Sequence, residues 1–168
     1  LSKQELASAV EACLALSGKG DCSYGPQGAI GEWEVSSVMD TSWLFNNKVF
    51  FNADISRWDV SRVISMKSMF MKAVSFNTDI SKWDVSRVTN MYGMFMDAAS
   101  FNADISKWDV SSVKDMDGMF YHATAFTQIF CTTAWVHSNA SKISMFEGTS
   151  GSISSTVCTV VVFSPQSR

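Results

Sequence analysis

The four cysteines have the most definite chemistry in this 168-residue chain, because paired cysteines form disulfides and clustered cysteines bind metals. They are Cys13, Cys22, Cys131 and Cys158. Of the three connectivities that four cysteines allow, sequence proximity favours the two local pairs, Cys13–Cys22 and Cys131–Cys158. Disulfides persist in oxidising compartments, so this pairing predicts such a compartment. Four free buried thiols or a zinc site are alternatives, but there is no C-x-x-C, and only His122 and His137 could add nitrogen ligands.

The other reactive side chains form no recognisable catalytic group. The sequence contains no G-x-S-x-G, no H-E-x-x-H and no glycine-rich phosphate loop, and its two histidines stand in unrelated contexts. We therefore expect no enzyme activity, no cofactor and no metal. Asn139-Ala140-Ser141 is an N-glycosylation sequon, which makes Asn139 a candidate glycosylation site.

The chain contains four consecutive copies of a 25-residue block, which align without gaps. The structure formed by these copies must position the residues named above. The copies span 26–50, 51–75, 76–100 and 101–125, and the third reads FNTDISKWDVSRVTNMYGMFMDAAS. A fixed period of roughly 20 to 50 residues indicates one supersecondary unit per repeat, which buries its apolar face by stacking on its neighbours. We predict a single domain, 1–168, in which 1–25 is an N-terminal cap with a helix, 26–125 are the repeats, and 126–168 are a degenerate last coil and a C-terminal cap.

Within each repeat the apolar spacing changes partway through. In the second copy, Ile55 to Val60 has the spacing of a short extended segment, whereas the spacing from Val63 to Ala73 is that of a short helix. Asp59 suits an Asx turn between the two halves. We therefore predict an α/β, right-handed repeat solenoid of about four to five coils, each with a short parallel strand and a short helix. Two columns of core side chains would run through it: Trp33, Trp58, Trp83 and Trp108, and Phe45, Phe70, Phe95 and Phe120.

Both ends of the chain depart from the repeat, as the exposed ends of such a stack require. Ser2 and Glu5 fit a capping box, and Gly18 is a natural stop for the helix that would follow. One face of this helix is apolar and carries Leu6, Ala9, Val10, Cys13 and Leu14. We expect it to lie as a lid over the first coil.

Aspartates recur in register and would stack at about 5 Å, where like charges repel unless they are hydrogen-bonded, paired or bridged by a cation. They are Asp54, Asp79 and Asp104, and a basic column of Arg57, Lys82 and Lys107 runs nearby. We favour hydrogen bonds from the adjacent turn, with a bound calcium ion as the alternative.

Positions that vary between the copies are free to form a specific surface. The candidate partner surface consists of Lys67, Tyr92 and Asp117, with Met71, Met96 and Tyr121 at the edge of the predicted helical stripe. The second set could be packed between coils or exposed as an apolar strip, and we favour packing. An exposed strip of this kind would mark an interaction patch.

Composition excludes several classes of partner. Thirteen basic and sixteen acidic residues leave a net charge of -3, and no basic run is long enough to follow a phosphate backbone, so nucleic acid is not expected. The apolar stretch 160–163 is far shorter than the roughly 20 residues of a membrane helix, so no transmembrane segment is expected. Because the first residue is Leu1 rather than Met, we expect a processed or partial product.

The block F-N-x-D-I-S-x-W-D-V-S-x-V-x-x-M-x-x-M-F resembles the BspA-like leucine-rich-repeat surface proteins, of bacterial and algal type. The resemblance covers Pro26 to Ala125, and the flanking segments 20–33 and 131–153 are similar to the opening and closing segments of algal members. It implies a leucine-rich-repeat-like solenoid used for adhesion or protein-protein contact. It implies no catalytic residues.

These observations predict a non-catalytic interaction, scaffold or adhesion module that presents a repetitive face to a protein or glycan partner. The expected location is extracellular or at the cell surface. One alternative is a structural subunit docked on a larger complex in an oxidising organelle lumen. Another is an ice- or crystal-surface binder that uses serine columns such as Ser61 and Ser86, although Trp, Asp and basic residues interrupt those rows.

Overall fold

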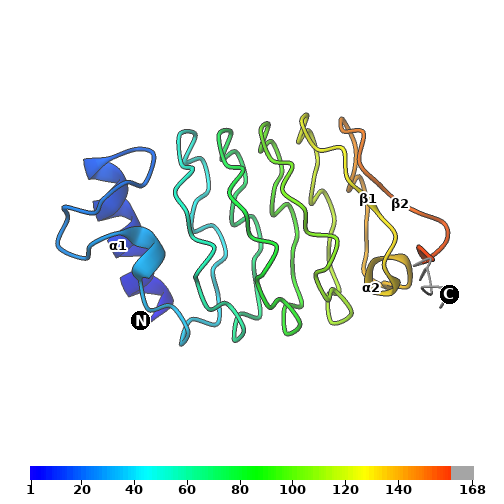
Figure 1. Cartoon of the computed structure of the whole chain (residues 1–168), viewed down its shortest axis with the longest axis horizontal. Coiled ribbons are helices and arrows are strands. Elements are labelled where there is room, and N and C mark those ends of the chain that lie inside the picture. The colour runs from blue at the N-terminus through cyan, green and yellow to red at the C-terminus, as the bar shows by residue number, and fades with distance from the viewer. Residues whose placement is uncertain (160–168) are drawn as a thin grey trace, which may run out of the picture.

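The computed structural model describes residues 1–159 as a row of stacked layers (Figure 1). Its elements are α1 (Lys3–Leu16), the 3-10 helix η1 (Ile30–Glu32), β1 (Ile129–Phe130), α2 (Thr133–Val136) and β2 (Ser152–Ile153). Helix α1 lies at one end of the row, and β1, α2 and β2 lie at the other. Residues 160–168, which include the apolar stretch 160–163 and part of the predicted C-terminal cap, lie outside the described residues.

The predicted α/β repeat solenoid, with a strand and a helix in every coil, is wrong. Across residues 1–159 the regular strands are β1 and β2 alone, which pair in parallel with Ile129 opposite Ser152 and Phe130 opposite Ile153. Between residues 33 and 128 the backbone forms turns, and the β-pairing between neighbouring layers is limited to isolated parallel bridges. These bridges are Asp40↔Ser65, Ser65↔Asn90, Asn90↔Asp115 and Asp115↔Ser141. The layers are therefore turn-rich rather than built from strands and helices.

The segment predicted to be helical is a chain of tight turns. The N–H groups of residues 66, 68, 70 and 72 donate to carbonyls 24 residues further along, at 2.8–2.9 Å. The intervening N–H groups close turns, as Met71 does onto the carbonyl of Ser68. Ser68 and Lys72 have φ of 52° and 58°, which an α-helix does not allow. Consecutive turns therefore satisfy the same apolar spacing that suggested a helix.

The segment predicted to be extended is interrupted by turns about every five residues. The carboxylate of Asp54 accepts the N–H of Ser56 at 2.9 Å, and that of Asp59 accepts the N–H of Ser61 at 3.0 Å. Between them the N–H of Trp58 closes a turn onto the carbonyl of Ile55. Asx turns of this kind offer the backbone local partners in place of a ladder. No run is left that could form a strand of ordinary length.

The core contains the two predicted aromatic columns, which the structure confirms, together with buried Val, Ile and Met side chains. Rings 25 or 26 residues apart in the column Phe45, Phe70, Phe95, Phe120 and Phe146 stack with centroids 5.4–5.7 Å apart. A second phenylalanine column lies beside it, formed by Phe51, Phe76, Phe101 and Phe126. Within a layer the two rings stack at 3.7–4.0 Å. Each layer therefore buries its aromatic rings against the next.

The tryptophan column links the layers by hydrogen bonds as well as by packing. Nε1 of Trp58 donates to the carbonyl of Ile30 at 2.8 Å, that of Trp83 to Ile55 at 3.2 Å, and that of Trp108 to Ile80 at 3.1 Å. A buried indole N–H without a partner destabilises a fold, so the carbonyl of the preceding layer gives each ring a fixed place.

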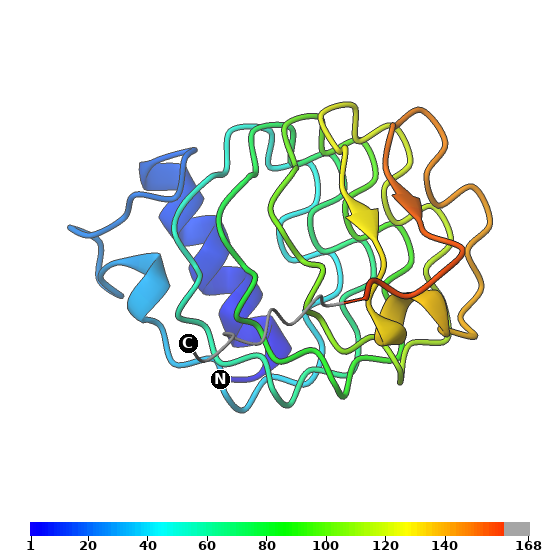
Figure 2. The same cartoon turned by 45° about the vertical axis from the view of Figure 1, so that its right-hand side comes forward.

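Helix α1 closes one end of the stack, as predicted, and lies across the first layer (Figure 2). Ser2 and Glu5 form the capping box, and Leu6, Val10 and Cys13 are buried. The helix ends at Leu16, two residues before the predicted stop at Gly18.

Two disulfides join the local pairs that sequence proximity favoured. Cys13 in α1 is bonded to Cys22 in the loop that follows, and both are buried. At the other end Cys131 is bonded to Cys158, which ties the chain after β1 to the chain after β2. The two cross-links therefore hold the irregular ends and leave the four repeats free of covalent constraint.

We predict that Trp83→Ala lowers the free energy of unfolding by about 3–5 kcal/mol, because it leaves a cavity in the column and orphans the carbonyl of Ile55. Lys82→Ala, its exposed neighbour, is the matched control and should change stability by less than about 0.5 kcal/mol. Urea unfolding of the two variants measures both effects. Equally small changes would contradict the stacked-layer core.

We predict that each disulfide stabilises its own end of the stack. Loops closed by sequence separations of 9 and 27 residues should contribute about 2.5 and 3.5 kcal/mol by chain entropy. Cys13→Ser with Cys22→Ser should raise hydrogen exchange in α1, and Cys131→Ser with Cys158→Ser should raise it around β1 and β2. Faster hydrogen exchange in the central layers, with unchanged exchange at the two ends, would contradict this local role.

Candidate functional site

The candidate partner surface lies on the row of tight turns, and all six of its predicted residues are half-buried. Four of them, Tyr92, Met96, Asp117 and Tyr121, line one hollow of about 280 Å³. Gly118, Ile143 and Ser144 complete its wall. Because residues 25 apart lie in neighbouring layers, side chains distant in sequence meet here. Lys67 lies beside this hollow and Met71 does not line it.

Lys67 connects the hollow to Trp43, an aromatic residue of the preceding layer. Its ammonium group lies 5.1 Å from the ring centroid of Tyr92 and 6.0 Å from that of Trp43. A cation within about 6 Å of a ring face is attracted by the quadrupole of the ring. The interaction orders the long lysine side chain between two aromatic residues, so that Trp43, Lys67 and Tyr92 form one continuous surface.

Trp43 is the residue of this surface that sequence reasoning missed. It is 47% exposed and has a φ of 68°, a left-handed conformation that a bulky side chain rarely adopts. The corresponding residues of the other layers are small and also have positive φ: Ser68, Gly93, Gly118 and Ser144. Strain of this kind costs about 1–3 kcal/mol and collects at functional positions. An alignment of the copies alone would have shown a tryptophan where the others carry serine or glycine.

Asp117 has a role in the fold and is not the free surface residue that the sequence suggested. Its Oδ1 accepts hydrogen bonds from the hydroxyl of Ser141 at 2.5 Å and from the N–H of Ile143 at 2.7 Å. It therefore anchors the following layer. Asn139, the candidate glycosylation site, is exposed, whereas Ser141 of the same sequon is held by this bond.

Met96 is packed between layers and still lines the hollow. A Cβ added to Gly118 would lie 2.7 Å from the Met96 methyl group, and Gly118 has a φ of 60°. The Met96 methyl group therefore packs closely against the backbone of the next layer. This is the packed arrangement that we favoured, here combined with partial exposure.

The aspartate column is held by hydrogen bonds from its own layers. Asp54, Asp79 and Asp104 each accept the N–H of the serine two residues on, at 2.9 Å. Hydrogen bonding from these serines lowers the pKa of each carboxyl group below its ordinary value. In the part of the chain that the structure describes, no three His, Cys, Asp or Glu side chains come close enough to hold a metal ion. Arg57 of the basic column pairs with Glu32.

The stacked turns and the shared surface define a turn-rich repeat protein. The chain matches the family model described as Mycoplasma protein of unknown function, DUF285, over residues 20–135 and again over 69–155. It therefore belongs to this family. No curated protein and no solved structure matches the chain. Among residues 1–159, no helix has the length and apolar content needed to cross a bilayer.

We predict that acid destabilises the protein through the aspartate column. A carboxyl group whose folded pKa is lowered stabilises the fold above its unfolded pKa of about 3.9, and this contribution is lost as the pH falls through the folded pKa. The melting temperature should therefore be flat from about pH 7 to pH 5 and fall below about pH 4.

The control replaces Asp54, Asp79 and Asp104 together by Asn, whose side-chain oxygen accepts the same hydrogen bond but does not titrate. The acid-induced fall in melting temperature should be shallower in this variant. An identical fall in the two proteins would show that these carboxylates do not carry the pH dependence.

Proposed function

We propose that this protein is a non-catalytic module that binds another protein through the surface formed by Trp43, Lys67, Tyr92, Met96 and Tyr121. The observation that carries the proposal is the continuous arrangement of these side chains across neighbouring layers. Tyr, Trp and Met are enriched at the centres of protein interfaces, where Trp and Tyr often dominate the binding energy. The hollow beside Tyr92 offers a place for a partner side chain.

The rigid support of these side chains favours recognition of a macromolecule. Gly93, Gly118 and the backbone N–H groups of the turn row are held by hydrogen bonds between layers, so the surface is formed before a partner arrives. Preorganised side chains lose little entropy on binding. A glycan is the second candidate partner, and Tyr92 and Tyr121 favour it, since their rings present flat apolar faces beside hydroxyl groups.

We further propose a location at the cell surface or outside the cell. The two disulfides support an oxidising compartment. The relation that we infer to the BspA-like surface proteins points the same way. A structural subunit in an oxidising organelle lumen is the alternative, and binding to ice or another crystal surface is a weaker one, because Trp and charged residues interrupt the serine rows.

We predict that Trp43→Gly weakens partner binding by at least about tenfold, as expected for an interface anchor. The same change should leave the melting temperature unchanged or raise it, because glycine adopts the left-handed conformation without strain. Partners are first captured from the native source by cross-linking, and a purified partner is then titrated against both proteins by calorimetry.

The matched control is Lys82→Glu with Lys107→Glu, which alters the basic column on another part of each layer and should leave affinity unchanged. Partner binding that survives Trp43→Gly and Tyr92→Ala but is lost in this control would show that the surface is wrongly placed. If a purified oligosaccharide binds at the Tyr92 hollow and no protein partner is captured, the ligand of this surface is a glycan and not a protein.

A further inference from the structure

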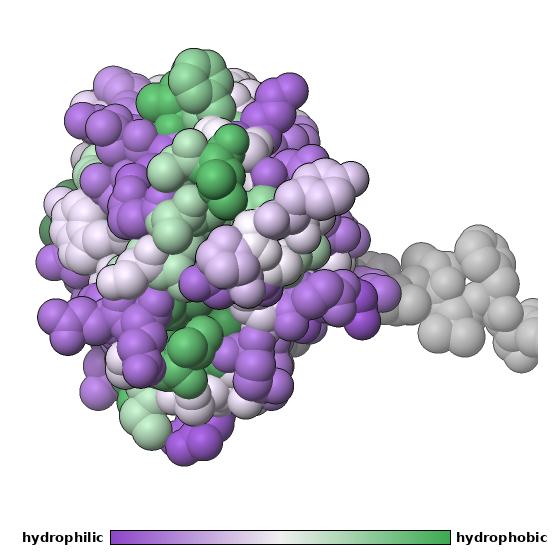
Figure 3. Space-filling model, turned by 90° about the vertical axis from the view of Figure 1, so that its left-hand side faces the viewer, coloured by the Kyte–Doolittle hydropathy of each residue, from purple (hydrophilic) through white to green (hydrophobic). Residues whose placement is uncertain are grey.

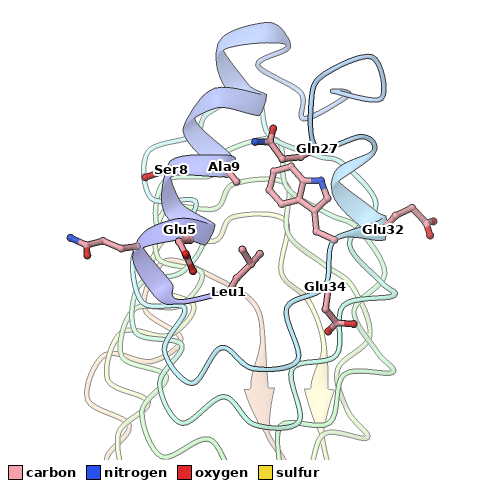
Figure 4. A pocket seen from close by; sticks show the side chains of 9 residues that line it. Leu1, Glu5, Ser8, Ala9, Gln27, Glu32 and Glu34 are labelled. Carbon is pink, nitrogen blue, oxygen red and sulfur yellow. The ribbon is translucent and has the colours of Figure 1, made fainter.

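A second hollow lies at the N-terminal end of the stack, away from the proposed partner surface. It measures about 980 Å³, more than three times the volume of the hollow at Tyr92. Figure 4 shows it between α1 and the segment that carries Gln27, Glu32 and Glu34. Its lining residues are Leu1, Gln4, Glu5, Ser8, Ala9, Gln27, Glu32, Trp33 and Glu34, and we call this space the cap groove.

The cap groove exists because a helix replaces a layer. Every other tryptophan of the column packs beneath a preceding layer, and Trp58, Trp83 and Trp108 are 2–4% exposed. Trp33 belongs to the first layer, has only α1 above it, and is 9% exposed. Helix α1 covers this layer with Leu6, Val10 and Cys13, and a straight helix does not reach all of a flat layer. The uncovered part is the groove.

The floor of the cap groove is apolar. Leu1 and Ala9 point into the space in Figure 4, and Trp33 also lines it. Figure 3, which faces this end of the molecule, shows hydrophobic side chains in a broken band between hydrophilic ones. Leu1 is 47% exposed, so part of this floor is open to solvent. Apolar surface of this kind is stabilised when a ligand covers it.

The rim of the cap groove is acidic. Its lining includes three glutamates and no Lys or Arg. Glu32 points outward in Figure 4 and pairs with Arg57, so the free charge comes from Glu5 and Glu34 on opposite walls. Hydrogen bonds from Ser2 and Ser36 hold these two carboxylates in place and lower the pKa of each. The α-amino group of Leu1, which donates to Ser37, is the positive charge nearby.

We propose that the cap groove binds an extended basic and apolar peptide segment of a partner protein, with an apolar side chain against Trp33 and a Lys or Arg side chain between Glu5 and Glu34. Charge complementarity selects this occupant over a second copy of the chain. The opposite end of the stack, residues 131–159, carries one lysine and one glutamate. The ammonium group of that lysine, Lys142, donates hydrogen bonds to the carbonyls of Ser138 and Ala140. Within residues 131–159 there is therefore no free Lys or Arg side chain to offer to an acidic groove.

The test titrates the whole protein with end-blocked synthetic peptides of equal length that alternate Lys with Leu, Glu with Leu, Gln with Leu, and Lys with Ser. Nitrogen-proton NMR follows the indole N–H of Trp33 and the amides of 27–34. We expect only the Lys-Leu peptide to shift these signals strongly. Glu5→Gln with Glu34→Gln should weaken its binding by at least about fivefold. Glutamine at position 5 keeps the capping box, so the variant retains α1.

Two further variants make the outcome decisive. Ser8→Trp should fill the cap groove and abolish binding at an unchanged melting temperature, because Ser8 is exposed on α1. Glu147→Gln, which removes one acidic charge at the far end of the stack, is the control and should have no effect. Equal binding of the Glu-Leu peptide, no binding at all, or self-association removed by Ser8→Trp would overturn the proposal. Shifts confined to Tyr92 and Trp43 would also overturn it and would leave the proposed partner surface standing.

Discussion

The hydrogen bonds between the backbones of neighbouring layers are the constraint on which the rest of this structure depends. Along residues 66–72, every second N–H donates to a carbonyl of the next layer, and the others close turns within their own layer. A buried backbone must satisfy its donors. Because these N–H groups already donate to the next layer or close turns, they cannot form the hydrogen bonds of an α-helix. A layer that bonds to the next must also repeat its conformation, and residues 25 apart therefore lie above one another.

Side-chain columns follow from this repetition. Each phenylalanine stacks on its counterpart, and each indole finds a carbonyl one layer back. Polar columns obey the same rule: Asn52 Oδ1 accepts the N–H of Asn77, and Asn77 Oδ1 accepts that of Asn102. The first and last layers of the stack lack a neighbour on one side, so structural elements other than a repeat cover them. A capped helix, a short parallel pair and two disulfides occupy these places.

The same constraint explains where function can reside. Positions that point into the stack repeat almost unchanged, whereas Trp43, Lys67 and Tyr92 differ from their counterparts and share one surface. The backbone around Trp43 is held by bonds to the next layer, which allows a bulky residue to keep a left-handed conformation. The repeats supply rigidity, and the variable positions supply specificity.

The period, the aromatic columns, the cap helix with its capping box, and the local pairing of the cysteines could all be predicted from the sequence. These features depend on spacing, composition and nearest neighbours along the chain. The turns that make up each layer could not be predicted, because the spacing from Val63 to Ala73 suits both a helix and consecutive turns. The choice depends on whether an N–H finds its carbonyl four residues back or one layer away, and that second partner is remote in sequence. The surface around Tyr92 was predicted in part. Its hollow and the fold role of Asp117 emerged only when the layers stacked, since their contacts join residues about 25 apart.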